Sequence, residues 1–158
     1  MATEIERKFL VFADKLPVLE NGQHFIQGYL SLLPNVRYRM IDDQVIITIK
    51  KDKVGGPGRY EWEFADTVSD KEEREELKKL AVRIPIEKIR YKIFYQNLTW
   101  EIDVYQGENN GLITAEVELP SIDYQIIFPE WIDKENEVGH NPKYFNSNLG
   151  EYPYQSWV

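Results

Sequence analysis

The sequence predicts a mainly β protein with a few helices (α+β), built as an eight-stranded antiparallel closed β-barrel that forms a tunnel. Eight segments show the polar–apolar alternation, or the β-branched and aromatic content, that is typical of strands. Most connections between these segments are short, as in an antiparallel sheet. Closing the sheet into a barrel removes its exposed edges, and helices are then expected to pack outside.

The first half of the chain contains five of the predicted strands. The first covers residues 3–11, where Glu4, Glu6 and Lys8 alternate with apolar residues such as Phe9. Turn signals rich in Pro, Asn, Asp and Gly separate the strands that follow. These strands are expected at 23–33, 36–41, 44–51 and 59–65.

One helix is predicted over 70–82. Ser69 as the N-cap and Glu72 at the third helical position form a capping box, and Leu77 and Leu80 belong to its apolar stripe. Pro85 marks the end of this segment.

The second half of the chain is expected to add three strands, at 86–96, 98–106 and 112–119. Asn97 predicts a tight turn, and Asn109-Asn110-Gly111 predicts an Asn-Gly hairpin. After Pro120 the pattern becomes irregular, and 122–136 and 142–149 are interpreted as short helical segments.

Composition limits the classes of protein. A chain of 158 residues with 42% apolar content predicts one domain over 1–158 with a core of its own. The net charge of −8 argues against nucleic-acid binding, although local cations can still bind a small anion. Neither a bilayer-spanning run nor a signal peptide is visible, and there is no cysteine, so we expect no membrane partner and a cytoplasmic location.

The charged face of the strands has two interpretations. In one, an ordinary sheet packs its apolar face on a core and leaves its charges in water. In the other, the charges line a lumen and the apolar face points outward, covered by helices, the C-terminal segment or another subunit. The second is favoured because large residues such as Trp62 and Trp100 lie opposite the charges, and because carboxylates and cations segregate by strand. The outward aromatic residues are compatible with a homodimer.

The charged residues form two chemical sets. Glu4 and Glu6 in the first strand, and Glu116 and Glu118 in the last, would bring four carboxylates together, and such a group needs protons or a cation. Oxygen ligands without cysteine select Mg²⁺, Mn²⁺ or Ca²⁺ over Zn²⁺. Arginine and lysine hold phosphate, and the cationic set is Lys8, Arg37, Arg39, Lys50, Lys88 and Arg90. Together the two sets predict a polyphosphate substrate that carries a divalent metal.

The order of these motifs resembles the CYTH, or triphosphate tunnel metalloenzyme, superfamily over nearly the whole chain. The matching motifs are Glu4-x-Glu6-x-Lys8, Gln27-Gly28-Tyr29-Leu30, Arg37-x-Arg39, Thr48-Ile49-Lys50, Arg59-x-Glu61-x-Glu63, Lys88-x-Arg90-Tyr91, Glu101-x-Asp103 and Glu116-x-Glu118. The tail around Pro129-Glu130-Trp131 and 143–149 also resembles that family, except that Lys143 and Asn141 replace an expected arginine and acid.

The resemblance implies roles for individual residues. Glu4, Glu6, Glu116 and Glu118 are the implied ligands of one or two Mg²⁺ or Mn²⁺ ions. Asp103, Glu61 and Glu63 are implied as ligands of a second metal or as groups that position water. Lys88 is expected to assist the leaving phosphate or orient the attacking water. The phosphate-binding residues implied are Lys8, Arg37, Arg39, Lys50, Lys88, Arg90 and Tyr29.

The resemblance also implies an enzyme. We expect metal-dependent hydrolysis of the terminal phosphate of a triphosphate, with inorganic tripolyphosphate as the preferred substrate and nucleoside triphosphates as further substrates. The alternatives are a class IV adenylate cyclase, for which no adenine pocket can be named, a thiamine triphosphatase, and a non-catalytic polyphosphate-binding module. The last is disfavoured because the metal-binding carboxylates are all present.

Overall fold

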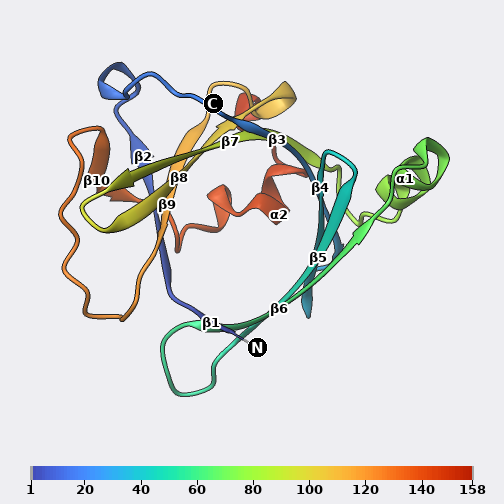
Figure 1. Ribbon diagram of the computed structural model, residues 1–158, viewed down its shortest axis with the longest axis horizontal. Coiled ribbons are helices and arrows are strands. Elements are labelled where there is room, and N and C mark those ends of the chain that lie inside the picture. Colours follow the sequence, from blue (N-terminus) through green and yellow to red (C-terminus); the bar gives the residue numbers. More distant parts are fainter. Residues whose placement is uncertain (1, 158) are drawn as a thin grey trace.

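A single sheet of ten antiparallel strands dominates the protein (Figure 1), whose computed structural model describes residues 2–157. The strands are β1 (Ala2–Glu4), β2 (Glu6–Val11), β3 (Gln23–Ser31), β4 (Asn35–Ile41), β5 (Gln44–Asp52), β6 (Arg59–Thr67), β7 (Ile86–Tyr95), β8 (Leu98–Tyr105), β9 (Ile113–Glu118) and β10 (Ile132–Glu137). They lie in the order β1-β6-β5-β4-β3-β7-β8-β9-β2-β10. The mainly β class is therefore confirmed, but the sheet has ten strands instead of the predicted eight, and its two edge strands, β1 and β10, are not paired with each other.

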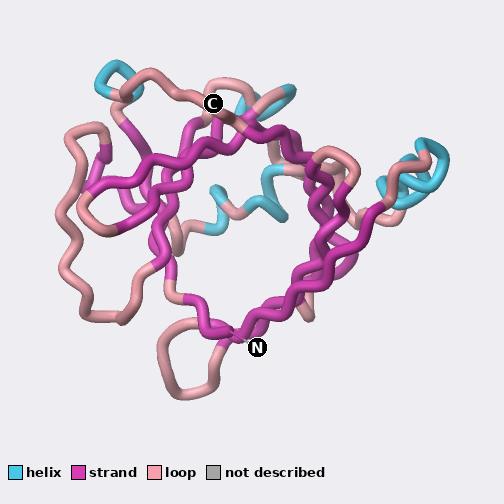
Figure 2. Tube along the Cα trace, viewed as in Figure 1, coloured by secondary structure: helices cyan, strands magenta, loops and turns pink. Residues whose placement is uncertain are grey.

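The sheet closes through the chain rather than through a ladder of hydrogen bonds. The strand predicted over 3–11 is divided at Ile5 into β1, which pairs with β6, and β2, which pairs with β9. Because β2 pairs with β9 along one edge and with β10 along the other, it has no free edge for β6. Only the preceding segment, β1, pairs with β6. The Ile5 carbonyl accepts a hydrogen bond from the Leu119 amide at 2.7 Å, and the trace forms a ring (Figure 2).

The tenth strand was not predicted. Residues 122–136 were expected to contain short helices, but the structure places β10 there, at the edge of the sheet. Ile132 is its only buried residue, so the segment lacks the alternation that predicts a strand. The helical prediction for 142–149 is confirmed by a 3₁₀ turn at Pro142–Tyr144 and by α2 (Asn146–Leu149).

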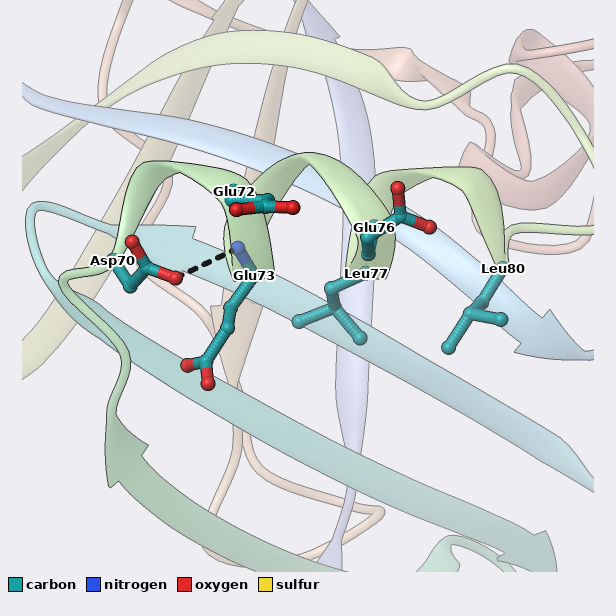
Figure 3. A pocket seen from close by; sticks show the side chains of 6 residues that line it. All are labelled: Asp70, Glu72, Glu73, Glu76, Leu77 and Leu80. Carbon is teal, nitrogen blue, oxygen red and sulfur yellow. Dashed lines mark hydrogen bonds between the residues drawn. The ribbon is translucent and has the colours of Figure 1, made fainter.

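The helix α1 (Lys71–Lys79) is shorter than the predicted 70–82, and its N-cap is Asp70 rather than Ser69. The Asp70 side chain accepts a hydrogen bond from the Glu73 amide at 3.3 Å, which satisfies one of the free amides of the first turn. Leu77 packs on the outer face of the sheet, near Tyr38. The hollow beside α1 is lined mainly by acidic side chains and lies outside the barrel (Figure 3).

The apolar core also lies outside the barrel. Phe9 and Trp100 point away from the lumen and pack against Phe128 and Trp131, which come from the segment after β9. This segment covers part of the outward apolar face without any second subunit. Phe64 on β6 remains 60% exposed, and the homodimer stays a prediction. Neither helix within residues 2–157 is long and apolar enough to cross a membrane.

The C-terminal segment covers one end of the barrel. Tyr105 donates a hydrogen bond to Asn146, and Lys8 Nζ lies 3.4 Å from the Tyr144 carbonyl oxygen. Leu149 is fully buried against Tyr105, and α2 is seen within the ring in Figure 1.

The connection between β8 and β9 anchors this segment. Asn109 is buried; its side chain accepts a hydrogen bond from the Tyr154 amide at 2.7 Å and donates one to the Leu149 carbonyl at 3.3 Å. The predicted hairpin is present, because β8 and β9 pair antiparallel, but its connection contains a 3₁₀ turn at Gly107–Asn109 that presents Asn109 to the C-terminal segment.

Candidate active site

The predicted charges face the lumen. Directly paired residues of neighbouring antiparallel strands point to the same side of a sheet, and the register pairs Lys8 with Glu116 and Arg90 with Asp103. Lys88 is 0% exposed and Asp103 is 2% exposed. Charges this deeply buried exclude the interpretation in which the charged face is an ordinary wet surface.

The first cluster joins β1, β2, β5 and β6. Lys50 Nζ lies 2.9 Å from Glu4 Oε1, and Arg59 Nη2 lies 3.2 Å from Glu4 Oε1 and 2.7 Å from Glu6 Oε1. Burial disfavours the charged form of Glu4, but a hydrogen bond with Glu61 and the two cations outweigh it and lower the pKa of Glu4 to about 2. The same hydrogen bond, together with burial, raises the pKa of Glu61 to about 8.

The second cluster brings the carboxylates of β2 and β9 together. Glu6 lies directly opposite Glu118, and Lys8 lies opposite Glu116. Burial and the charge of Glu116 raise the pKa of Glu6 to about 8, and burial and Glu4 raise the pKa of Glu118. For Glu116, burial is outweighed by the charges of Lys8 and Arg90, which lower its pKa. The predicted crowding of carboxylates is therefore present.

The third cluster is a buried ion-pair network on β7 and β8. Asp103 accepts hydrogen bonds from Lys88 Nζ at 2.8 Å, from Arg90 Nε at 2.7 Å and from Arg90 Nη2 at 2.9 Å. Burial opposes ionisation of Asp103, but Lys88 and Arg90 outweigh it and hold its pKa well below the usual range. Burial lowers the pKa of Lys88 to about 7 despite this partner. Both carboxylate oxygens of Asp103 are thus engaged by cations, unlike those of a free metal ligand.

A cationic wall on β4 lies beside uncharged polar groups. Arg39 Nη2 lies 3.1 Å from Glu63 Oε1, whereas the buried Nε atoms of Arg37 and Arg39 have no hydrogen-bond partner among the described residues. The Gln27 side chain donates a hydrogen bond to the Tyr29 hydroxyl at 3.2 Å. The buried Oε1 atom of Gln27 has no hydrogen-bond partner among residues 2–157. A buried polar group without a partner is costly, so these groups are suited to a bound ligand.

Four residues of the lumen belong to the candidate site in the structure but were not predicted as site residues. Arg59, which belongs to a matching motif but was given no role, bridges two carboxylates. Phe25, Gln27 and Thr48 carry no charge and were not among the predicted site residues, although all three are buried on lumen-facing positions. The sequence indicated them only through alternation: Phe25 and Gln27 lie an even number of residues before Tyr29 in β3, and Thr48 lies two residues before Lys50 in β5.

A metal ion requires oxygen ligands that converge. Within residues 2–157 no group of three acidic or histidine side chains is close enough to hold a metal ion as the side chains stand. Lys50 and Arg59 neutralise Glu4 and Glu6 instead. The donor set nevertheless has the all-oxygen chemistry of a magnesium or manganese site, and burial together with neighbouring carboxylates raises the pKa of Glu6 and of Glu118.

Known proteins share both the sequence pattern and the fold. The sequence profile of the CYTH domain matches residues 2–143. A protein of Acetivibrio thermocellus named inorganic triphosphatase is 38% identical over 159 residues, which is 99% of each chain.

Solved structures agree with this match. The inorganic triphosphatase NE1496 is 30% identical, with a TM-score of 0.65 over 95% of each chain. A protein of Pyrococcus horikoshii OT3 is 22% identical, with a TM-score of 0.51 over 76% of this chain and 80% of that one, and this likeness concerns the fold alone.

Proposed function

This chain belongs to the CYTH domain family, and from that premise we propose that it hydrolyses the terminal phosphate of a triphosphate, with inorganic tripolyphosphate as the preferred substrate. Two similar proteins that each cover at least 95% of the chain are named inorganic triphosphatases. The cyclase, thiamine triphosphatase and non-catalytic alternatives have no comparable support.

The observation that carries the proposal is the set of Nε donors without partners in the cationic wall. Arg37 and Arg39 keep buried Nε donors without partners, although carboxylates lie within the same lumen. Arginine forks bind phosphate oxygens with paired hydrogen bonds, and each charge-assisted bond contributes about 1.5–3 kcal/mol. We assign Arg37, Arg39, Lys50 and Arg90, with Lys8, Lys88 and Tyr29, to the phosphate chain.

The metal is assigned to the carboxylates of β1, β2 and β9. Glu4, Glu6, Glu116 and Glu118 would hold Mg²⁺ or Mn²⁺ through oxygen atoms. When bound, such an ion neutralises charge on the phosphate oxygens and stabilises the transition state. The ion would also favour the ionised forms of Glu6 and Glu118, whose pKa values are raised by burial and by neighbouring carboxylates.

The remaining residues prepare the water and the leaving group. Glu61 has a pKa of about 8, so in its ionised form it is a suitable acceptor for a proton of the attacking water, with Glu63 beside it on the same strand face. The water oxygen bonds to the terminal phosphorus as the bond to the bridging oxygen breaks. Lys88 neutralises the departing diphosphate. We place Asp103 as the residue that orients Lys88 and Arg90, instead of as a metal ligand.

The test compares phosphate release from tripolyphosphate and from ATP for the wild type, Arg39→Ala and Lys92→Ala. Lys92 lies on the same strand face as Lys88 but is exposed, so it is the matched control. We expect tripolyphosphate to be preferred, and Arg39→Ala to lower kcat/KM about tenfold or more, as loss of a charge-assisted bond implies. Equal kcat/KM for Arg39→Ala and the wild type would remove Arg39 from the site.

A further inference from the structure

Phe25 is an apolar ring inside the charged tunnel. It lies on β3 directly opposite Lys88 of β7, two residues before Gln27, which pairs with Arg39 of β4. Its position therefore shares the lumen-facing parity of these residues, and its side chain is only 3% exposed. An apolar side chain at this place adds nothing to the outer core, so its buried position calls for another explanation.

Three cations surround this ring. The guanidinium carbons of Arg90 and Arg39 lie 5.2 Å and 5.8 Å from its centroid, and Lys88 Nζ lies 5.8 Å from it. All three distances fall within the range in which a cation is attracted to the face of an aromatic ring. The three cations come from two strands that flank β3 on either side, so the ring is their common contact.

Only one of the carboxylates that pair with these cations is buried. Lys88 and Arg90 share the buried Asp103, Arg90 Nη1 also lies 3.2 Å from the partly exposed Glu101, and Arg39 pairs with the half-exposed Glu63. Like charges held this close repel one another, and without an attractive group between them they would move apart or turn toward the carboxylates of the lumen.

The side chain at position 25 decides which ligands these three cations can bind. A carboxylate there would neutralise the cations and repel phosphate. An aliphatic side chain would keep the cations buried but would offer them no electrostatic attraction of its own. An aromatic ring compensates them through its electron-rich face and leaves their net positive charge available.

We propose that Phe25 is a positioning residue whose ring holds Arg39, Lys88 and Arg90 together, pre-arranged for the oxygens of a phosphate chain. This inference rests on the proposed function. In a pre-arranged site, no binding energy is needed to bring the binding groups together. The ring therefore strengthens both substrate binding and transition-state stabilisation.

The test replaces Phe25 with phenylalanines that carry one, two, three and four ring fluorines. Fluorination keeps the shape of the ring and withdraws electron density from its face. We measure the Kd for tripolyphosphate by calorimetry in EDTA, the KM and kcat with Mg²⁺, and the Tm. The same substitutions at Phe128, whose ring contacts Phe9 and Trp100, are the matched control. Phe25→Leu is made as a second variant.

The expected result is a stepwise rise of Kd and KM with each fluorine at position 25, reaching about tenfold for four fluorines, while kcat falls. The control series at Phe128 leaves all three unchanged. A flat series at position 25 overturns the inference, including the case in which Phe25→Leu alone weakens binding, because that result would show a packing role only. A wild type that neither binds nor hydrolyses tripolyphosphate overturns the proposed function itself.

Discussion

Asp103→Asn is expected to destabilise the protein strongly, because it breaks the network between β7 and β8. Asp103 is 2% exposed and accepts three hydrogen bonds, one from Lys88 and two from Arg90. Asparagine has nearly the same size but no charge, and its NH₂ group would face a cation. Removing one partner of a buried ion pair costs about 3–5 kcal/mol, because the other charge stays buried.

The assay is urea unfolding followed by tryptophan fluorescence, with Tm as a second readout. A loss of about 3–5 kcal/mol corresponds to a fall in Tm of roughly 6–20 °C for a chain of this size. Asp123→Asn makes the same charge change at an exposed turn position and should leave stability within about 0.5 kcal/mol of the wild type.

The pH dependence gives an independent check. The pKa of Asp103 is lower in the folded than in the unfolded chain, so its contribution is complete above the unfolded pKa of about 3.9 and is lost as pH falls further. Asp103→Asn should therefore reduce the acid sensitivity of the wild type. A variant that is within about 1 kcal/mol of the wild type at pH 7 would refute the network as a stabilising element.

Three further predictions follow from the site and the sheet. The affinity for Mn²⁺, followed by the decrease of its free-ion EPR signal, should rise between pH 6 and pH 9, because the assigned ligand Glu6 has a pKa of about 8 and a protonated carboxyl does not bind metal; an affinity independent of pH would contradict this value. Arg59→Gln should tighten Mn²⁺ binding in the same assay, because Arg59 competes for Glu4 and Glu6, whereas weaker binding would mean that Arg59 organises the carboxylates. Gly28→Ala should lose about 1–3 kcal/mol in urea unfolding, because a Cβ atom there would lie 2.4 Å from the buried ring of Tyr38, and an unchanged midpoint would show that this contact relaxes freely.

The sequence predicted which side chains share the lumen better than it predicted their partners. Alternation with a period of two places Lys88, Arg90 and Asp103 on one face of their strands, and the structure buries all three there. The pairing of Asp103 with both cations depends on the register between β7 and β8, which alternation does not specify. The role implied for Asp103, as a ligand of a second metal or a group that positions water, therefore took no account of these ion pairs.

The fold departs from the prediction where tertiary contacts decide. The break at Ile5 follows from the competition of β6, β9 and β10 for one N-terminal segment, and no local feature of the sequence marks it. Asn109 resembles a hairpin residue in sequence but binds the C-terminal segment in space. Phe25 carries no charge, so the charge pattern of the sequence does not indicate it, and its contribution depends on the cations of neighbouring strands.

The most direct test of the central claim is the hydrolysis of tripolyphosphate in water enriched in ¹⁸O, followed by ³¹P NMR. With Mg²⁺ or Mn²⁺ we expect equal amounts of phosphate and diphosphate, with the label in the phosphate, and no turnover in EDTA. That result would mean metal-dependent attack of water on the terminal phosphorus. Label in the diphosphate, turnover that persists in EDTA, or no turnover with any metal would contradict the account.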